Sequence, residues 1–350
     1  MTLTTLPRKP LLTLASATAA CAVALSACGT TSTEDPAGDS TAKAATSESC
    51  ENDSTTTSTE PVTVTDDLGE KVELDEPAAK VVSLEWQFTE DLLSLCVNPA
   101  AVADAKGYST WVSAETLPEG VADVGTRQEP NVESILAANP DLVITEVTSR
   151  NDKVVKQIED QGVPVLALKG ADTEDPIAYM KDTFSLIGEA TGRTERAEGV
   201  LKEFDAKLAE SKDEIASADI PSKEFVFFDG YVDGTNVALR PFGQGSLVGE
   251  LGESVGLTNA WTGEVDPAYG LGQTDIEGLS EAGNGTLFYS GTEDPESESY
   301  VDLLKKNDIW ANIPAVKEDR THAFPAGIWT FGGPKSSGQV LDAYTDALTK

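Results

Sequence analysis

The sequence predicts an α/β protein of two lobes, each with a central, mostly parallel sheet, joined by one long helix with a ligand cleft between the lobes. Three observations predict this fold class. A helical period spans residues 193–218, and strand-like runs alternate with helix-like runs on both sides of it, over 61–192 and 219–350. The order helix, strand, helix, strand in 130–168 also returns in 272–325. A cleft between two such lobes is a preferred place for a ligand.

The long helix is expected from a single apolar stripe, with charged residues on its other faces. Thr194 is in position to cap its start, and Pro221 prevents its continuation. About 24 residues at ~1.5 Å each give a rod of roughly 36 Å, as long as a small domain is wide. The alternative is one larger α/β domain in which this segment is an ordinary surface helix. The stripe consists of Ala197, Val200, Leu201, Phe204, Leu208 and Ile215.

The amino terminus indicates where the protein resides. Two basic residues precede an apolar run over 11–25, which is shorter than a typical membrane span. The run ends in Leu-Ser-Ala-Cys at 25–28, which resembles the lipobox of bacterial lipoproteins. That resemblance implies a signal peptide over 1–27 and a lipid anchor on Cys28, at the outer face of the cytoplasmic membrane. The alternative is an ordinary secretory signal that is cleaved nearby.

Residues 28–60 are mostly Ser, Thr, Glu, Asp and Ala, so they bury little and are predicted to form a disordered tether. Cys50 lies in this tether, and Cys96 lies at the end of a predicted helix. In an oxidising compartment the two could form a disulfide that attaches the tether to the first lobe. A free, buried Cys96 with an unpaired Cys50 is the alternative.

In the first lobe, period-two alternation around Asp67-Leu68-Gly69 predicts a hairpin. The remaining elements follow in order as strand 81–84, helix 89–96, strand 101–103, a helix beginning near Asn131, strand 141–146, helix 151–161 and strand 164–168. The second lobe begins with strand, turn, strand, loop and helix over 223–256. Helix and strand follow over 272–290, then a helix near 299–307 and a strand near 321–325.

Composition excludes several classes of function. The formal net charge of −35 argues against nucleic acid as a partner, although it permits contact with a basic protein surface. A single histidine, His322, and four cysteines leave few soft ligands, so we expect no metal site and no cofactor. The chain also lacks the GxSxG motif of many hydrolases, so a hydrolase remains only a distant alternative.

Three stretches carry a family resemblance: VVSLEWQFTEDLLSLCVNPAAVADA (81–105), DVGTRQEPNVESILAANPDLVI (123–144) and WANIPAVKEDRTHAFPAGIWTFGGP (310–334). They are similar to the substrate-binding lipoproteins of ferric-siderophore and ferric-citrate ABC importers. The resemblance implies two lobes bridged by one helix and no catalysis. It also implies a monomer that delivers a ferric siderophore of carboxylate or hydroxamate type, possibly ferric citrate, to the importer's membrane subunits. Iron would then be bound only through the siderophore. Cys96 stands where that family usually has glycine.

Two arginines are the main candidates for ligand contact. Arg127 lies in a turn before a predicted helix, and the resemblance makes it the family's ligand-contacting arginine. Arg240 ends a strand of the second lobe and would face Arg127 across a basic cleft. Arg150 follows strand 141–146 and is a weaker candidate. The alternative for Arg127 is a surface arginine paired with a nearby glutamate, either residue 129 or residue 133.

Further candidates for lining the pocket are Trp86, Gln87, Tyr108, Trp111, Tyr269 and Trp329, with Tyr108 and Trp111 expected on a loop.

Transporter docking is expected at one glutamate on each lobe, Glu133 and Glu253, with Glu250 as the alternative to the latter. The vitamin B12-binding relative uses one glutamate per lobe to contact arginines of its membrane subunits. In a chain with 60 acidic residues, both could equally be bystanders on solvated helices.

A haem- or corrinoid-binding protein of the same superfamily is the alternative function, with His322 or a tyrosine as the axial ligand of haem iron.

Overall fold

A computed structural model describes residues 48–350 except 235, 283 and 291–298. The predicted signal peptide, Cys28 and the tether as far as residue 47 lie outside the described residues. Within them, no helix has both the length and the apolar character needed to cross a membrane.

The first lobe is built on a five-stranded parallel sheet with the strand order β5-β4-β3-β6-β7. Its core strands are apolar on both faces, as parallel strands covered by helices on both sides must be. Val82 of β3, for example, pairs with Val143 of β6, and both are fully buried. The strands are β3 (Val81–Ser83), β4 (Ala101–Val102), β5 (Ala122–Asp123), β6 (Leu142–Glu146) and β7 (Val165–Leu168), beside the antiparallel hairpin β1 (Val62–Thr65) and β2 (Lys71–Leu74). The helices are α1 (Trp86–Ser94), α2 (Ala105–Trp111), α3 (Val132–Ala137) and α4 (Lys153–Glu159).

The second lobe has the parallel strand order β10-β8-β11-β12, with β9 antiparallel to β8. The predicted recurrence is confirmed, since α3-β6-α4-β7 in the first lobe corresponds to α8-β11-α9-β12 here. The strands are β8 (Glu224–Asp233), β9 (Asn236–Pro241), β10 (Thr258–Asn259), β11 (Thr286–Tyr289) and β12 (Thr321–Ala323). The helices are α7 (Leu247–Ser254), α8 (Ile276–Glu281), α9 (Tyr300–Leu304) and α10 (Pro314–Lys317), with a 3₁₀ turn η2 (Trp310–Asn312).

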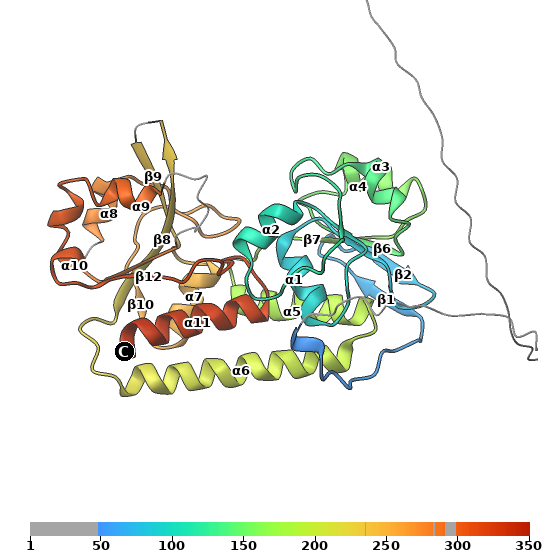
Figure 1. Cartoon of the computed structure of the whole chain (residues 1–350), viewed down its shortest axis with the longest axis horizontal. Coiled ribbons are helices and arrows are strands. Elements are labelled where there is room, and N and C mark those ends of the chain that lie inside the picture. The colour runs from blue at the N-terminus through green and yellow to red at the C-terminus, as the bar shows by residue number, and fades with distance from the viewer. Residues whose placement is uncertain (1–47, 235, 283, 291–298) are drawn as a thin grey trace, which may run out of the picture. The chain divides into compact units, whose positions relative to one another are not determined.

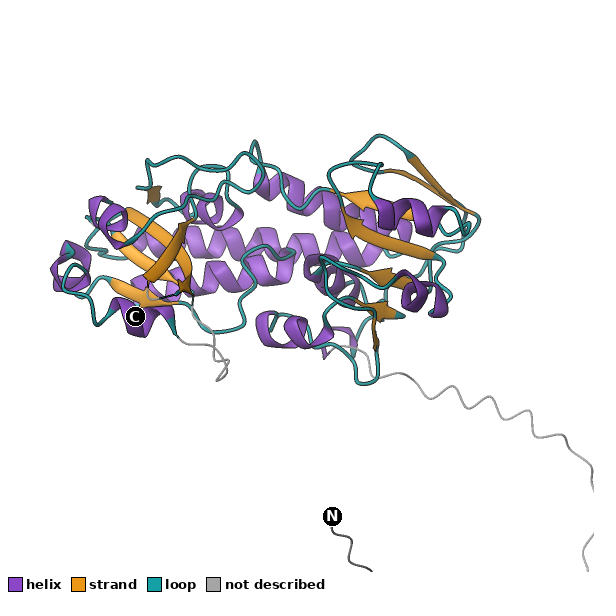
Figure 2. Cartoon of the chain, turned by 90° about the horizontal axis from the view of Figure 1, so that it is seen from above, coloured by secondary structure: helices purple, strands orange, loops and turns teal. Residues whose placement is uncertain are grey.

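The bridging helix is α6 (Thr194–Ser217), and its apolar stripe serves two cores. Ala197 and Val200 pack into the core of the first lobe, whereas Phe204 and Ile215 pack into that of the second. Two further helices, α5 (Pro176–Ala190) and α11 (Pro334–Thr349), pack beside α6. Figure 1 shows α6 passing below both sheets with α11 alongside it, and Figure 2 shows the long helices between the two groups of strands. The predicted fold class is therefore confirmed.

The start of α6 differs from the prediction. Thr194 is the first helical residue, and Arg193 occupies the N-cap position without a side-chain cap. The Arg193 side chain instead contacts two residues that precede the first lobe and the residue that follows α1. It donates to Leu95 O at 2.9 Å and Thr57 Oγ1 at 2.9 Å, and it forms an ion pair with Asp53.

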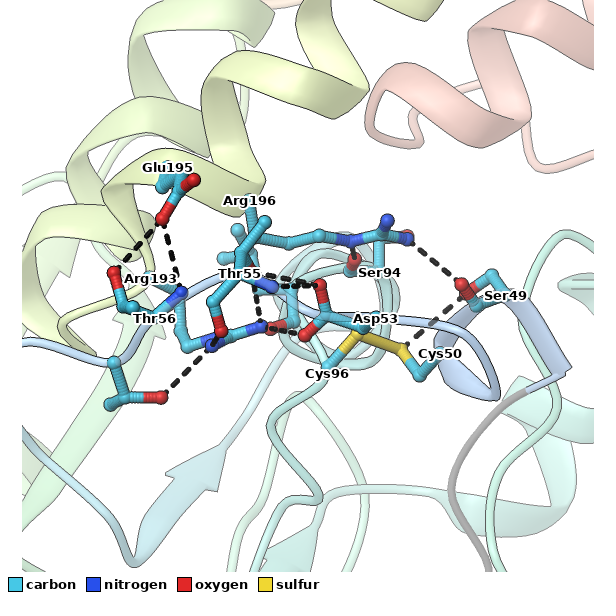
Figure 3. A network of polar contacts seen from close by, with 12 residues as sticks. Ser49, Cys50, Asp53, Thr55, Thr56, Ser94, Cys96, Arg193, Glu195 and Arg196 are labelled. Atoms are coloured by element: carbon cyan, nitrogen blue, oxygen red, sulfur yellow. Dashed lines mark hydrogen bonds and ion pairs between the residues drawn. A yellow bond between two sulfur atoms is a disulfide. The ribbon is translucent and has the colours of Figure 1, made fainter.

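The last part of the segment predicted as a tether, residues 48–60, is attached to the first lobe. The 3₁₀ turn η1 (Glu48–Cys50) carries Cys50, which is disulfide-bonded to Cys96 at the end of α1. Arg196 donates to Ser94 O at 3.0 Å and to Ser49 O at 3.1 Å. Figure 3 shows these contacts converging at the start of α6. The disulfide is thus the one of the two alternatives for Cys50 and Cys96 that the structure contains. The contacts of Arg193 and Arg196 were not predicted, because their partners lie in distant parts of the sequence.

Candidate functional site

A cavity of about 270 Å³ lies between the two lobes and is lined by residues of both. The first lobe contributes from the carboxyl ends of its strands, where open α/β sheets bind ligands. Glu85 follows β3, and Glu146 is the last residue of β6. The full lining is Glu85, Gln87, Arg127, Glu146 and Gly170 from the first lobe, and Arg240, Tyr269, Leu271, Trp329 and Phe331 from the second.

Arg127 is held at the cavity by a salt bridge and by stacking. Its Nη1 donates to Glu85 Oε1 at 2.7 Å, and its guanidinium lies 3.8 Å from the ring centre of Trp86. The loop that carries Arg127 is closed by a β-bridge between Gly125 and Pro130. Gly125 has a φ of +102°, which disfavours other residue types there. The partner of Arg127 is thus Glu85, and neither of the two glutamates weighed from the sequence.

Arg240 approaches from the second lobe and is also paired. It lies on β9 directly opposite Asp229 of β8. Its Nε donates to Asp229 Oδ1 at 2.8 Å and its Nη2 to Oδ2 at 2.5 Å. This bidentate geometry fixes the guanidinium plane and leaves its remaining N–H groups for other acceptors.

One hydrogen bond crosses directly from lobe to lobe inside the cavity. Tyr269 of the second lobe donates its hydroxyl proton to Glu146 Oε1 of the first. Burial, followed by the hydrogen bond to Glu146, raises the pKa of Tyr269 well above its usual value, so the phenol stays protonated. Gly170 makes this contact possible, because a Cβ there would lie 2.1 Å from the Tyr269 hydroxyl.

Trp329 and Phe331 add an aromatic surface to the cavity wall. Trp329 meets Trp86 edge-to-face with ring centres 4.8 Å apart, and it meets Phe331 at 5.2 Å. Phe331 in turn contacts Tyr269 at 5.6 Å. The Trp329 Nε1–H is buried and has no hydrogen-bond partner among the residues that the structure describes. A ligand in this cavity would meet flat apolar surface together with a few fixed polar groups.

The charge of the cavity differs from the sequence prediction of a basic pocket. Two arginines and two glutamates line it, and each arginine already has a carboxylate partner. Burial raises the pKa of Glu85, although the Arg127 charge acts in the opposite direction. The pairing partners decide the charge of this site, and they could not be identified from residue types alone.

The structure brings together Gln87, Arg127, Arg240, Tyr269 and Trp329 in one cavity, as proposed from the sequence. Trp86 is buried beneath Arg127, so it supports the site rather than lining it.

Three candidates lie elsewhere. Tyr108 and Trp111 belong to α2 instead of a loop, and the fully buried Tyr108 donates to Glu115 O at 2.9 Å. Trp111 packs against a buried cluster that contains Trp86 and Tyr108. Arg150 forms ion pairs with Asp66 and Glu159 beside the β1–β2 hairpin.

Five lining residues were not among the candidates predicted from the sequence: Glu85, Glu146, Gly170, Leu271 and Phe331. A signal was present for two of them. Glu85 directly follows the predicted strand 81–84, and Glu146 ends the predicted strand 141–146. The same carboxyl-end rule that drew attention to Arg150 would have identified both.

The docking candidates differ in their surroundings. Glu133 is exposed in the first turn of α3. Glu253 is half-buried in the last turn of α7, where its Oε1 accepts from the Asn259 N–H at 3.4 Å. Glu250 lies in the first turn of α7, and burial, followed by the charge of Glu253, raises its pKa.

His322 lies on β12, away from the cavity, so it is not placed to bind haem iron there. Burial lowers its pKa. Under the alternative function, haem binding, Tyr269 is the lining tyrosine that could serve as the axial ligand of the iron. Among the described residues, no group of three or more His, Cys, Asp or Glu side chains is arranged to hold a metal ion.

Comparison with known proteins places this architecture in a family. The Bacillus subtilis protein named as a putative ABC transporter substrate-binding lipoprotein, YhfQ, is 28% identical over 299 residues, covering 83% of this chain and 88% of that protein. The Fe(3+)-citrate-binding protein YfmC of the same organism is 28% identical over 260 residues, covering 74% and 77%.

Among solved structures, the siderophore-binding protein FhuD of Vibrio cholerae with bound Fe³⁺–Desferal has the same fold, with a TM-score of 0.63. It is 22% identical in sequence, and the match covers 77% of this chain and 97% of that one. The family model described as periplasmic binding protein matches residues 81–326, which is more than half of the sequence. The chain therefore belongs to the periplasmic binding protein family.

Proposed function

We propose that this protein is the extracytoplasmic binding component of an ABC importer and that it captures a ferric siderophore, of carboxylate or hydroxamate type, with ferric citrate included. The observation that carries the proposal is the cavity between the lobes, which is lined by Arg127 of the first lobe, Arg240 of the second and an aromatic wall. The relatives support it, because their names describe an importer lipoprotein, a ferric-citrate-binding protein and a siderophore-binding protein.

The arrangement suits binding rather than catalysis. The siderophore would supply every ligand of the iron, and the protein would supply shape, aromatic surface and hydrogen-bond donors. The guanidinium groups are held in place by Glu85 and Asp229, so little side-chain freedom is lost when a ligand oxygen accepts from them. The protein would act as a monomer anchored through Cys28 to the outer face of the cytoplasmic membrane.

Delivery would use one acidic contact on each lobe. Glu133 on α3 and Glu253 on α7, or Glu250 in its place, are the proposed contacts with the importer's membrane subunits. Such rim contacts contribute little affinity individually, but they can fix the orientation of the loaded protein and speed its encounter with the importer.

Tryptophan fluorescence tests the proposal. Trp329 lines the cavity and Trp86 lies beneath Arg127 in contact with Trp329, so binding of a ferric siderophore should quench their emission in a saturable way. Metal-free siderophores are the control for the iron complex. Hemin and cobalamin are tested in parallel, because binding of haem or a corrinoid is the alternative function. Hemin binding is measured from its absorption band. Saturable binding of hemin or cobalamin without binding of any ferric siderophore or ferric citrate would overturn the proposal.

A further inference from the structure

The cavity contains more fixed negative charge than a site for an anionic complex should. Arg127 and Arg240 carry its positive charges, whereas Glu85, Glu146 and Asp229 carry negative ones at or beside its wall. Three carboxylates therefore face two guanidinium groups. Since the interior of such a cavity screens charge poorly, this balance bears directly on the charge of the ligand.

Glu85 cannot easily turn away from the cavity. Its Oε1 accepts from the Trp86 N–H at 2.9 Å, which caps the start of α1, and the same oxygen accepts from Arg127 at 2.7 Å. If Arg127 moved to neutralise an anionic ligand, Glu85 would be left as an unpaired, largely buried charge. Losing one partner of a buried ion pair is strongly unfavourable.

Glu146 and Asp229 are fixed in similar ways. The Tyr269 hydroxyl holds Glu146 from across the cleft, and the close approach of Gly170 limits the space around its carboxylate. Asp229 is held by both bonds from Arg240, and the cross-strand register places the two residues opposite each other. All three carboxylates therefore remain part of the site when a ligand arrives.

Ferric siderophores differ in net charge, and a site with this charge balance would distinguish them by it. Three singly charged hydroxamates balance the charge of Fe³⁺, so the complex is neutral, and a pendant ammonium makes it cationic. Three doubly charged catecholates leave three negative charges, and ferric citrate complexes are also anionic. A neutral trihydroxamate complex still presents polarised oxygens that can accept from Arg127 and Arg240.

We propose that Glu85 and Glu146 determine specificity by disfavouring anionic ferric complexes, so that the ligand of this cleft is a neutral or cationic ferric trihydroxamate. This inference rests on the proposed function and narrows it from two siderophore classes to one. The neutral complex would stack against Trp329 and Phe331 and accept hydrogen bonds from the arginines. A pendant ammonium would find its acceptor at Glu146.

The first test compares four ferric complexes with the wild-type protein: ferrichrome, which is neutral, ferric desferrioxamine B, which carries one ammonium, ferric enterobactin and ferric citrate. We expect the first two to bind at least about tenfold more tightly than the two anionic complexes, a difference of ~1.4 kcal/mol. Tighter binding of an anionic complex would overturn the inference and leave the proposed function standing. Binding of none of the four would overturn the proposed function itself.

The second test removes the charges and keeps the hydrogen bonds. In the double variant Glu85→Gln with Glu146→Gln, the amide oxygens can still accept from the Trp86 N–H and the Tyr269 hydroxyl. We expect the ratio of the affinity for ferric enterobactin to the affinity for ferrichrome, measured in the same variant, to rise about tenfold over the wild-type ratio. The matched control is Glu129→Gln with Glu277→Gln, which removes one exposed carboxylate from each lobe. Equal shifts in the two double variants, or no shift in the cavity variant, would overturn the role of Glu85 and Glu146.

Ionic strength gives a third measurement that needs no variant. Raising salt from about 0.1 M to 1 M shortens the screening length from ~10 Å to ~3 Å. If the cavity repels anionic complexes, salt should strengthen the binding of ferric enterobactin to the wild type and leave ferrichrome nearly unchanged. A basic cavity would show the opposite sign for ferric enterobactin, and that result would contradict the inference even if the double variant did not fold.

Discussion

Ser336 donates two hydrogen bonds to Glu90, from its backbone N–H to Oε1 at 2.9 Å and from its hydroxyl to Oε2 at 2.6 Å. Glu90 belongs to α1 of the first lobe, and Ser336 lies in the first turn of α11, which packs with the core of the second. Both residues are fully buried. The lobes are thus joined covalently by α6 and non-covalently by this contact, which lies a few residues beyond Trp329 and Phe331 of the cavity wall.

The Glu90 contact should make stability depend on pH. Burial raises the pKa of Glu90 from 4.5 to about 7, and the hydrogen bonds from Ser336 offset only part of that effect. A carboxyl whose pKa is raised by folding contributes stability that is fully present below about pH 4.5 and is lost as the pH rises through about 7. We expect Glu90→Gln, which stays neutral, to gain about 2–3 kcal/mol relative to the wild type between pH 5 and pH 8.

Urea unfolding followed by tryptophan emission measures this gain. The other titratable groups near Glu90 are Asp91, Glu115 and Tyr108, and they remain in the variant. Glu198→Gln on the exposed face of α6 is the control and should keep the wild-type pH dependence. The same slope in Glu90→Gln and in the wild type would show that Glu90 does not titrate in this range.

The two cavity arginines should each contribute to affinity. Arg127→Ala and Arg240→Ala should weaken binding of a ferric siderophore by about 1.5–3 kcal/mol, the usual range for a hydrogen bond to a charged group. Arg150→Ala is the matched control, because Arg150 is ion-paired outside the cavity and its loss should leave affinity unchanged. Unchanged affinity in both cavity variants would remove the cleft from consideration as the binding site.

Docking and ligand binding should be separable. In the double variant Glu133→Ala with Glu253→Ala, uptake in cells should fall sharply while affinity for the ferric siderophore in solution stays the same. Glu133→Ala with Glu250→Ala, measured in parallel, decides between the two glutamates of α7. A loss of affinity would assign these residues to the pocket instead, and unchanged uptake in both double variants would contradict the docking proposal.

Arg193 should be important for stability although it does not line the cavity. Its side chain and that of Asp53 are both largely buried, with 6% and 11% of their surface exposed. Arg193→Ala leaves Asp53 without its cationic partner, so we expect a loss of about 3–5 kcal/mol. Among the described residues, Arg196→Ala removes bonds to two carbonyl oxygens, and it should cost about 1–3 kcal/mol. Equal losses in the two variants would contradict the special role of the buried pair.

The fold was predictable because its signals are local. The stripe of α6, the hairpin β1–β2 and the alternation of strands with helices each depend on residues within one short segment. Candidates for the site were predictable only in part. The family resemblance singled out Arg127, and Arg240 was chosen because it ends a strand, and both line the cavity. The rule that ligands bind at the carboxyl ends of strands pointed to Tyr108, Trp111 and Arg150, which lie elsewhere.

The remaining features depend on partners that are distant in sequence. Arg127 pairs with Glu85, 42 positions away, and Arg150 pairs with Asp66, 84 positions away, so neither the charge of the cavity nor the exclusion of Arg150 could be predicted. Tyr108 was misplaced for a local reason. The Asp104 side chain accepts from the Gly107 N–H and starts a short helix, α2, where we expected a loop.

The Cys50–Cys96 disulfide has a consequence for a chain that is held at a membrane. If the protein is anchored at Cys28 as proposed, the tether between the anchor and the first lobe ends at Cys50 rather than at residue 60. The 22 residues over 29–50 reach at most about 75 Å when fully extended, whereas the 32 residues over 29–60 would reach about 110 Å. The volume within reach scales with the cube of that length, so it falls to about a third. An anchored protein would therefore meet an importer in the same membrane at a higher effective concentration.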